Sequence, residues 1–170
     1  MFELPPAASE PEIVELYEYW RSKSPPGKLP GRQHIDPADF SPRLLPHILL
    51  ADVERTPDGP RFRLRVAGTS VVEMIGRDMT GRYFDEVAPA DRTGLVIAAL
   101  RTIVETGEPV FLESQLTVPS RDFIWVKRLG LPLARDGETV DMVLASFHSA
   151  PKPPATDVAA SKLRPFSGEN

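Results

Sequence analysis

The sequence predicts an α+β domain in which a five-stranded antiparallel sheet has its helices inserted after the second strand. Arginine alternates with apolar residues from Arg61 to Val66, which is the two-residue period of a strand with one buried face. The long helical pattern follows at residues 90–106 and ends at Gly107-x-Pro109. Three strand patterns then occupy residues 110–118, 123–133 and 139–148, joined by short polar turns that are typical of antiparallel hairpins.

The chain divides into three segments. Residues 29–150 hold the predicted domain, and residues 1–28 hold an N-terminal amphipathic helix with its linker. Residues 151–170 form a proline-rich tail that we expect to be disordered.

The N-terminal helix is predicted by an apolar stripe at helical spacing, formed by Ile13, Leu16, Tyr17 and Trp20. Ser9 and Glu12 have the spacing of a capping box, which predicts Ser9 as the N-cap. The helix ends before Pro25-Pro26-Gly27. We expect the stripe to pack against the sheet or against a second protomer.

The stretch between this helix and the first strand contains residues that could bind a metal, namely His34, Asp36 and His47. A local explanation is simpler, because Asp36-Pro37 places an N-cap acceptor before a proline at the first helical position. No further ligand follows at a known metal-site spacing. We therefore expect capped turns leading into a strand at residues 48–53, and no metal.

Short helices are predicted after the second strand. Ser70 and Glu73 have capping-box spacing, and Gly76 is a natural residue to end the helix. A second short element lies around residues 83–87. The three arginines at 61, 63 and 65 could form a phosphate-binding stripe, but the solvated side of an outer strand is the preferred interpretation.

Composition excludes several classes of function. The net charge of −4 and the pI of about 5.4 argue against nucleic-acid binding. The absence of cysteine excludes disulfides, thiolate metal sites and cysteine nucleophiles, and it fits a cytoplasmic location. No apolar run approaches the roughly 20 residues needed to span a membrane, and the N-terminus does not have the pattern of a signal peptide.

The order of the elements resembles the PAS domain. More narrowly, it is similar to the PAS_5-like family of small, often single-domain proteobacterial PAS proteins. The resemblance rests on YW at 19–20, LPGRQHIDP at 29–37, LLPHILLADV at 44–53, FRLRVAGTSVVEMIGRDMTGRYFDEV at 62–87 and LGLPLARDGETVDMVLASF at 129–147. It covers nearly everything from Glu12 to Phe147.

The resemblance implies a sensor or adaptor module for signal transduction, with an apolar cavity between the sheet and the helices. It also implies a homodimer formed through the N-terminal helix. No catalytic or DNA-binding output segment follows the last strand, so we expect another protein to provide the output. A flavin–cysteinyl adduct is excluded because there is no cysteine, and haem is disfavoured because the long helix has no histidine. We predict His47 and His148 to be capping or surface residues.

We predict that the cavity binds a small apolar or amphipathic ligand. The residues that we expect to line it are Leu64, Val66, Met74, Leu100, Ile103, Met142 and Leu144. The two methionines suit a wall that adapts to its guest. Two alternatives stay open at this point. One is a cone-shaped isomerase or hydratase using Asp85 or Glu86 beside Tyr83 as its base. The other is a protein–protein scaffold with a filled core.

Overall fold

The computed structural model describes residues 3–87, 90–118, 121–151 and 164–165. Its helices are α1 (Pro11–Lys23), α2 (Thr69–Ile75), α3 (Phe84–Val87) and α4 (Ala90–Thr106), with 3-10 turns η1 (Arg32–His34), η2 (Pro37–Asp39) and η3 (Leu45–His47). Its strands are β1 (Ile48–Thr56), β2 (Gly59–Ala67), β3 (Val110–Val118), β4 (Arg121–Leu133), β5 (Met142–Ala150) and β6 (Arg164–Pro165). Within the described residues, no helix has both the length and the apolar character that crossing a membrane requires.

The strands form one antiparallel sheet in the order β2-β1-β5-β4-β3-β6. The five long strands confirm the predicted sheet, and α2, α3 and α4 all lie between β2 and β3 in the chain, as predicted. The sixth strand was not predicted, because it lies in the tail that we expected to be disordered. Its two residues pair with β3 at Val110 and Phe111, and the tail's other residues beyond Pro151 lie outside the described residues.

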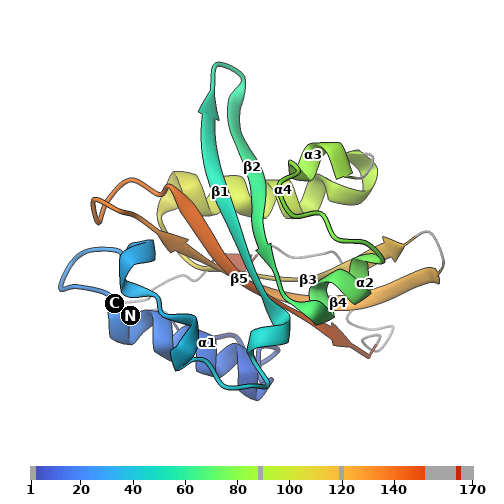
Figure 1. The fold of residues 1–170 in the computed structure, drawn as a ribbon, viewed down its shortest axis with the longest axis horizontal. Coiled ribbons are helices and arrows are strands. Elements are labelled where there is room, and N and C mark those ends of the chain that lie inside the picture. The colour runs from blue at the N-terminus through green and yellow to red at the C-terminus, as the bar shows by residue number, and fades with distance from the viewer. Residues whose placement is uncertain (1–2, 88–89, 119–120, 152–163, 166–170) are drawn as a thin grey trace.

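The sheet is covered by helices on both faces (Figure 1). We call the face under α2, α3 and α4 the inner face, and the face under α1 the outer face. Strands β4 and β5 show how side chains divide between the two, since alternate residues point to opposite faces. The inner cluster takes Val126, Val143, Ala145 and Phe147 from these strands. The outer cluster takes Leu129, Leu131, Leu133, Met142 and Leu144.

Helix α1 buries its apolar stripe on the outer face. Ile13, Leu16, Tyr17 and Trp20 are at most 5% exposed. The indole Nε1 of Trp20 donates a hydrogen bond to the Pro132 carbonyl oxygen at 2.8 Å. The stripe therefore packs against this chain's own sheet, and a dimer would have to form through another surface.

Both predicted serine N-caps are wrong. Helix α1 begins at Pro11 with Glu10 as the N-cap, and α2 begins at Thr69 with Gly68 as the N-cap. The Glu10 side chain accepts no capping hydrogen bond, and Gly68 has no side chain that could accept one. Proline at the first position of α1 already has a helical φ and lacks the N–H that a cap would satisfy, so the helix can begin there without Ser9.

The stretch between α1 and β1 forms capped turns bound to α1. Asp36 Oδ1 accepts a hydrogen bond from the Ala38 N–H at 2.9 Å, which confirms the predicted cap. Asp39 accepts hydrogen bonds from Tyr19 Oη at 3.0 Å and Lys23 Nζ at 3.1 Å. The aspartates of this stretch therefore have structural partners.

Strands β1 and β2 pair with a bulge that changes the direction of one side chain. Leu64 pairs with Ala51, whereas Val66 pairs with Leu50, so Arg65 is an extra residue in the ladder. Because paired residues point to the same face, Val66 turns to the side of Leu50 and away from Leu64. The prediction that Val66 is buried beside Leu64 is wrong, since Val66 is 43% exposed.

Candidate ligand-binding site

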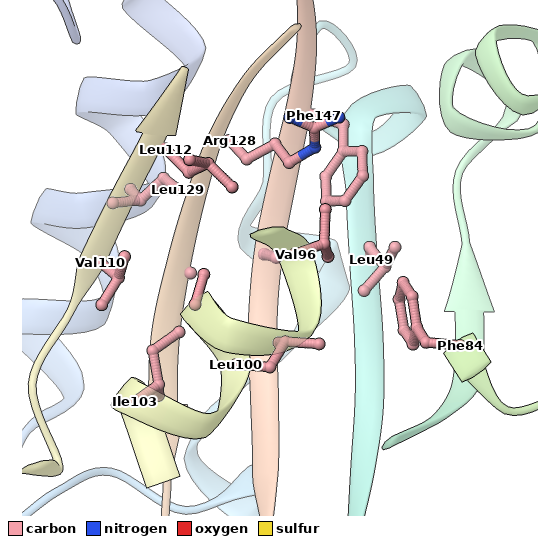
Figure 2. A pocket seen from close by; sticks show the side chains of 13 residues that line it. Leu49, Phe84, Val96, Leu100, Ile103, Val110, Leu112, Arg128, Leu129 and Phe147 are labelled. Carbon is pink, nitrogen blue, oxygen red and sulfur yellow. The ribbon is translucent and has the colours of Figure 1, made fainter. Parts of the chain in front are cut away.

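A cavity of about 30 Å³ lies between the inner face and α4. Helix α4 contributes Val96, Ala99, Leu100 and Ile103, which fall on one side of the helix. Phe84 of α3 and Leu49, Leu112 and Phe147 of the sheet complete most of the apolar wall (Figure 2). The volume corresponds to one or two water molecules, so a larger guest must displace some of these side chains.

Gly130 of β4 holds α4 close to the sheet. A Cβ atom at this position would lie 2.6 Å from Ile103 Cδ1, well inside van der Waals contact. The missing side chain lets Ile103 reach the strand, while Val96 and Leu100 extend into the space beside it (Figure 2). The floor of the cavity at this point is therefore backbone.

Among the described residues that line this apolar space, the charged one is Arg128 of β4. Arg128 is 5% exposed, and its guanidinium lies 5.1 Å from the centre of the Phe147 ring. Its Nη1 donates to Ser114 Oγ at 2.7 Å and, at the longer distance of 3.5 Å, to the Val126 carbonyl oxygen. Its Nε is buried without a hydrogen-bond partner among the described residues. Figure 2 shows the side chain running along the sheet toward Phe147.

Burial makes the charge of Arg128 unfavourable. It lowers the pKa of the guanidinium to about 10, which still leaves the group cationic at neutral pH. Among the described residues no carboxylate forms an ion pair with it. The inner face thus contains a desolvated cation that no carboxylate of the described residues neutralises.

The structure brings only part of the predicted cavity set together. Leu100 and Ile103 line the cavity. Leu64 and Met74 belong to the inner cluster but do not line it. Met142 and Leu144 point to the outer face of β5 and belong to the cluster beneath α1, so the prediction that they line the cavity is wrong.

Arg128 was missed in the sequence, although a signal was present. Val126, Arg128 and Gly130 alternate along β4, so the arginine stands where the pattern calls for an inward apolar residue. A charged residue at an inward position of a central strand is an indicator of function, since such groups are rarely buried without a partner.

The carboxylates considered for an isomerase site lie at the exposed rim. Arg61 binds Asp85 at 2.8 Å and Glu86 at 3.1 Å, and Tyr83 Oη donates to Glu54 Oε2 at 2.6 Å. The hydrogen bond from Arg61 lowers the pKa of the Asp85 carboxyl, which makes it a weaker base. Asp85 and Glu86 do not line the apolar cavity beside Arg128.

The row of arginines on β2 pairs with carboxylates of the neighbouring strand. Arg63 and Arg65 lie 3.7 and 3.1 Å from Asp52 in β1, and Arg63 lies 3.2 Å from Glu54. Both arginines are exposed. The arrangement agrees with the solvated side of a strand rather than with a phosphate-binding stripe.

A second polar cluster lies at the N-terminal end of α1. The rings of His47 and His148 stack with their centres 4.4 Å apart, and His47 Nδ1 lies 2.9 Å from the Phe147 carbonyl oxygen. Beside them Lys127 Nζ forms an ion pair with Glu10 Oε1 at 2.6 Å. Burial and, second, the neighbouring His47 lower the pKa of His148 to about 4.

The prediction that His148 is a capping or surface residue is therefore wrong, because the side chain is 5% exposed. It follows Leu144 and Ser146 on the outer face of β5, where α1 covers it. Its Nε2 has no hydrogen-bond partner among the described residues. Within the same part of the chain, no three His, Cys, Asp or Glu side chains form a group that could hold a metal.

The size of the cavity can be compared with what haem or flavin would need. Pockets for ligands of that size are typically about 300–1,000 Å³, and the cavity beside Arg128 is about 30 Å³. The side chains of this site therefore do not fit a large ring system as they stand.

The family model of PAS domains, PAS_5, matches residues 8–147. The chain belongs to this PAS domain family. The matched range includes α1, β1 to β4 and the first six residues of β5, so the helix on the outer face lies within the family match. A PAS domain is a sensory and signalling module, which confirms the fold class and the broad functional class predicted from the sequence.

Solved structures with similar folds have low identity to this chain. The Rhodobacter sphaeroides LOV protein is 14% identical with a TM-score of 0.48, over 61% of this chain and 58% of that chain. An RNA-binding light-oxygen-voltage receptor is 15% identical with a TM-score of 0.46, over 88% and 36%. A sensory box histidine kinase/response regulator from Burkholderia thailandensis E264 is 21% identical with a TM-score of 0.37, over 60% and 76%. These likenesses concern the fold and nothing beyond it, and no curated protein matches the chain.

Proposed function

We propose that this PAS domain is a non-enzymatic sensor that binds a small apolar or amphipathic ligand on its inner face and passes the signal to a partner protein. The observation that carries the proposal is the cavity beneath α4, where four side chains of one helix and a backbone floor at Gly130 enclose unfilled apolar space. Concave apolar sites with few polar groups are where small molecules bind proteins.

Entry of a ligand would change the position of α4. The cavity holds one or two waters, so a guest of several carbon atoms has to push Val96, Leu100 or Phe84 outward. Close-packed interiors respond to such displacement by shifting whole elements. Displacement of α4 would alter the surface of the molecule, and a partner protein could read that change.

The rim carboxylates support the non-enzymatic interpretation over the isomerase. Asp85 and Glu86 are exposed and held by Arg61, whereas a base of that class stands in an apolar pocket with its pKa adjusted to the reaction. An experiment can distinguish a ligand-binding sensor from a protein–protein scaffold with a filled core.

The test uses Leu100, which is 6% exposed and lines the cavity. We expect the melting temperature of the purified protein to rise with the concentration of at least one member of a panel of hexanol, indole and hexanoate. Leu100→Trp should fill the cavity and abolish that rise while the protein stays folded. Leu45→Trp, at a position 41% exposed, serves as the control and should keep the rise. A panel without any response, in the parent and in the control alike, leaves the scaffold as the function.

The partner is another protein or a second copy of this chain, and the proposal includes the homodimer that the family resemblance implies. Because the apolar stripe of α1 is buried against the sheet, deleting α1 would unfold the protein rather than test for a dimer. Sedimentation velocity over a range of concentrations tests for the dimer, and a sedimentation coefficient that stays at the monomer value would contradict the homodimer. We place the protein in the cytoplasm because a chain without cysteine suits a reducing compartment.

A further inference from the structure

The guanidinium of Arg128 has hydrogen-bonding capacity that its surroundings leave unused. A guanidinium carries five N–H donors. Nη1 makes one short bond to Ser114, while the buried Nε has no partner among the described residues. The three arginines of β2, by contrast, each have a carboxylate within 3.7 Å.

Leaving a cation in this state opposes folding. A buried charge is tolerated when a counter-ion and further hydrogen bonds offset its desolvation, and an apolar residue of similar volume is often more favourable. The inner cluster around Arg128 consists of such apolar residues. A missing anion would explain why a cation stands at this place.

We propose, building on the ligand site proposed above, that Arg128 binds the carboxylate of a ligand whose apolar body lies in the cavity beneath α4. Arginine binds carboxylates through two parallel N–H···O bonds, and Nε is one of the donors suited to that geometry. The walls beyond the guanidinium are apolar: Val96, Leu100, Ile103 and Phe84. The ligand class is an aliphatic or aromatic monocarboxylate.

Charge balance favours one carboxylate over a phosphate. Arg128 is the charged residue among those that line the cavity, and it contributes one positive charge. A carboxylate neutralises it, whereas a phosphate monoester near neutral pH carries close to two negative charges and would leave one of them buried. The proposal is therefore specific for a monoanion.

Ser114 provides a second polar contact for the same group. Its hydroxyl oxygen accepts the bond from Arg128 Nη1, and the residue is 2% exposed. A hydroxyl that accepts one bond can still donate its own hydrogen. Ser114 thus holds the guanidinium in place and can donate to a carboxylate oxygen beside it.

The experiment is a calorimetric titration of the full chain with hexanoate, hexanamide and hexyl phosphate. We expect hexanoate to bind more tightly than the two others, which have the same alkyl chain. Arg128→Met should weaken hexanoate binding by roughly 10- to 100-fold, the range expected for loss of hydrogen bonds to a charged group. Arg101→Met, which removes an exposed charge from α4, should leave hexanoate binding unchanged.

The results of these titrations distinguish the role of Arg128 from the existence of the cavity itself. Equal binding of hexanoate and hexanamide, both lost in Leu100→Trp, would support the cavity and overturn the role of Arg128. Stronger binding of hexyl phosphate would overturn the carboxylate. No binding of any of the three would overturn the carboxylate proposal, and the response to hexanol and indole would then decide whether the cavity binds a ligand.

A second measurement tests whether Arg128 has only a structural role. We expect the melting temperature of ligand-free Arg128→Met to equal or exceed that of the parent, because the variant removes an unpaired buried charge. A large fall in the melting temperature would show that Arg128 stabilises the inner face by itself, and it would overturn the proposal.

Discussion

The two faces of the sheet are built from the same strands but are completed differently. The outer face is covered by α1, whose Trp20 is buried and has its indole N–H bonded to the Pro132 carbonyl oxygen. The inner face retains a cavity and a charged group that has no counter-ion in the part of the chain that the structure describes. Helix α1 buries its whole apolar stripe on the outer face, and α4 leaves space beneath it on the inner face.

This difference indicates which face is structural and which is functional. An interior that is packed to native density has little to gain from a guest. A face that contains unfilled apolar volume and a desolvated cation can be stabilised by a ligand that has both an apolar group and a negative charge. Ligand binding is therefore expected on the inner face, and changes on the outer face are expected to act through stability.

The largest effect is expected for Trp20→Ala on the outer face. The variant removes a large buried side chain and leaves the Pro132 carbonyl without its donor, so we expect a loss of roughly 3–5 kcal/mol in the free energy of unfolding. Urea unfolding measures it. Val14→Ala on the exposed side of the same helix should change the value by about 0.5 kcal/mol or less. A small loss for Trp20→Ala would contradict the outer face as the packed one.

A matched pair of leucines compares the faces directly. Leu131 is fully buried in the outer cluster, whereas Leu100 borders the cavity. We expect Leu131→Ala to cost roughly 3–4 kcal/mol and Leu100→Ala roughly 2–3 kcal/mol, because the Leu100 side chain borders the cavity and so makes fewer packing contacts to lose. Urea unfolding without ligand would measure both losses. Equal losses would mean that the cavity leaves the packing of Leu100 unaffected.

Acid should weaken the outer face through His148. The pKa of His148 is lowered to about 4 by burial and by His47, while an unfolded histidine titrates near 6.5. Between these values the unfolded chain binds the extra proton, so the free energy of unfolding should fall as the pH drops from 6.5 to 4. We expect roughly 1–3 kcal/mol for this group.

The groups that face His148 have opposite effects on its pKa. Glu10 and Glu12 raise the pKa of His148, whereas Lys127 and His47 lower it. His148→Phe should flatten the stability profile between pH 4 and 6.5, and His34→Ala at an exposed position should leave it unchanged. A parallel fall in the parent and in His148→Phe would show that other groups cause the acid sensitivity.

Periodicity predicted the fold well because it reports directly on which side chains are buried. The alternation on β2 and the stripes of α1 and α4 gave the elements and their order. Val66 escaped prediction because a bulge adds one residue to the ladder, and local sequence does not specify that slip. Met142 and Leu144 were assigned to the wrong face because β5 is apolar on both sides, which removes the alternation.

The candidate site could be predicted only in part. Leu100 and Ile103 follow from the apolar face of a long helix, which must contact the sheet. Arg128 and Ser114 are brought together by the pairing of β3 with β4, and that register depends on the whole hairpin. The burial of His148 likewise depends on where α1 lies. Polar groups at a site are placed by tertiary structure, which short-range patterns do not encode.

The smallest effect is expected at the rim of the inner face, where Asp85 binds Arg61. The pair is exposed, so water screens it and the side chains lose freedom in forming it. The Arg61 hydrogen bond lowers the pKa of Asp85, so any contribution to stability is present at neutral pH and disappears as the pH falls through that pKa. We expect Asp85→Asn to leave the urea midpoint at pH 7 within error and the hexanoate response intact. Loss of that response would show that Asp85 is part of the ligand site. The inner face would then have two functional regions, the cavity and its rim.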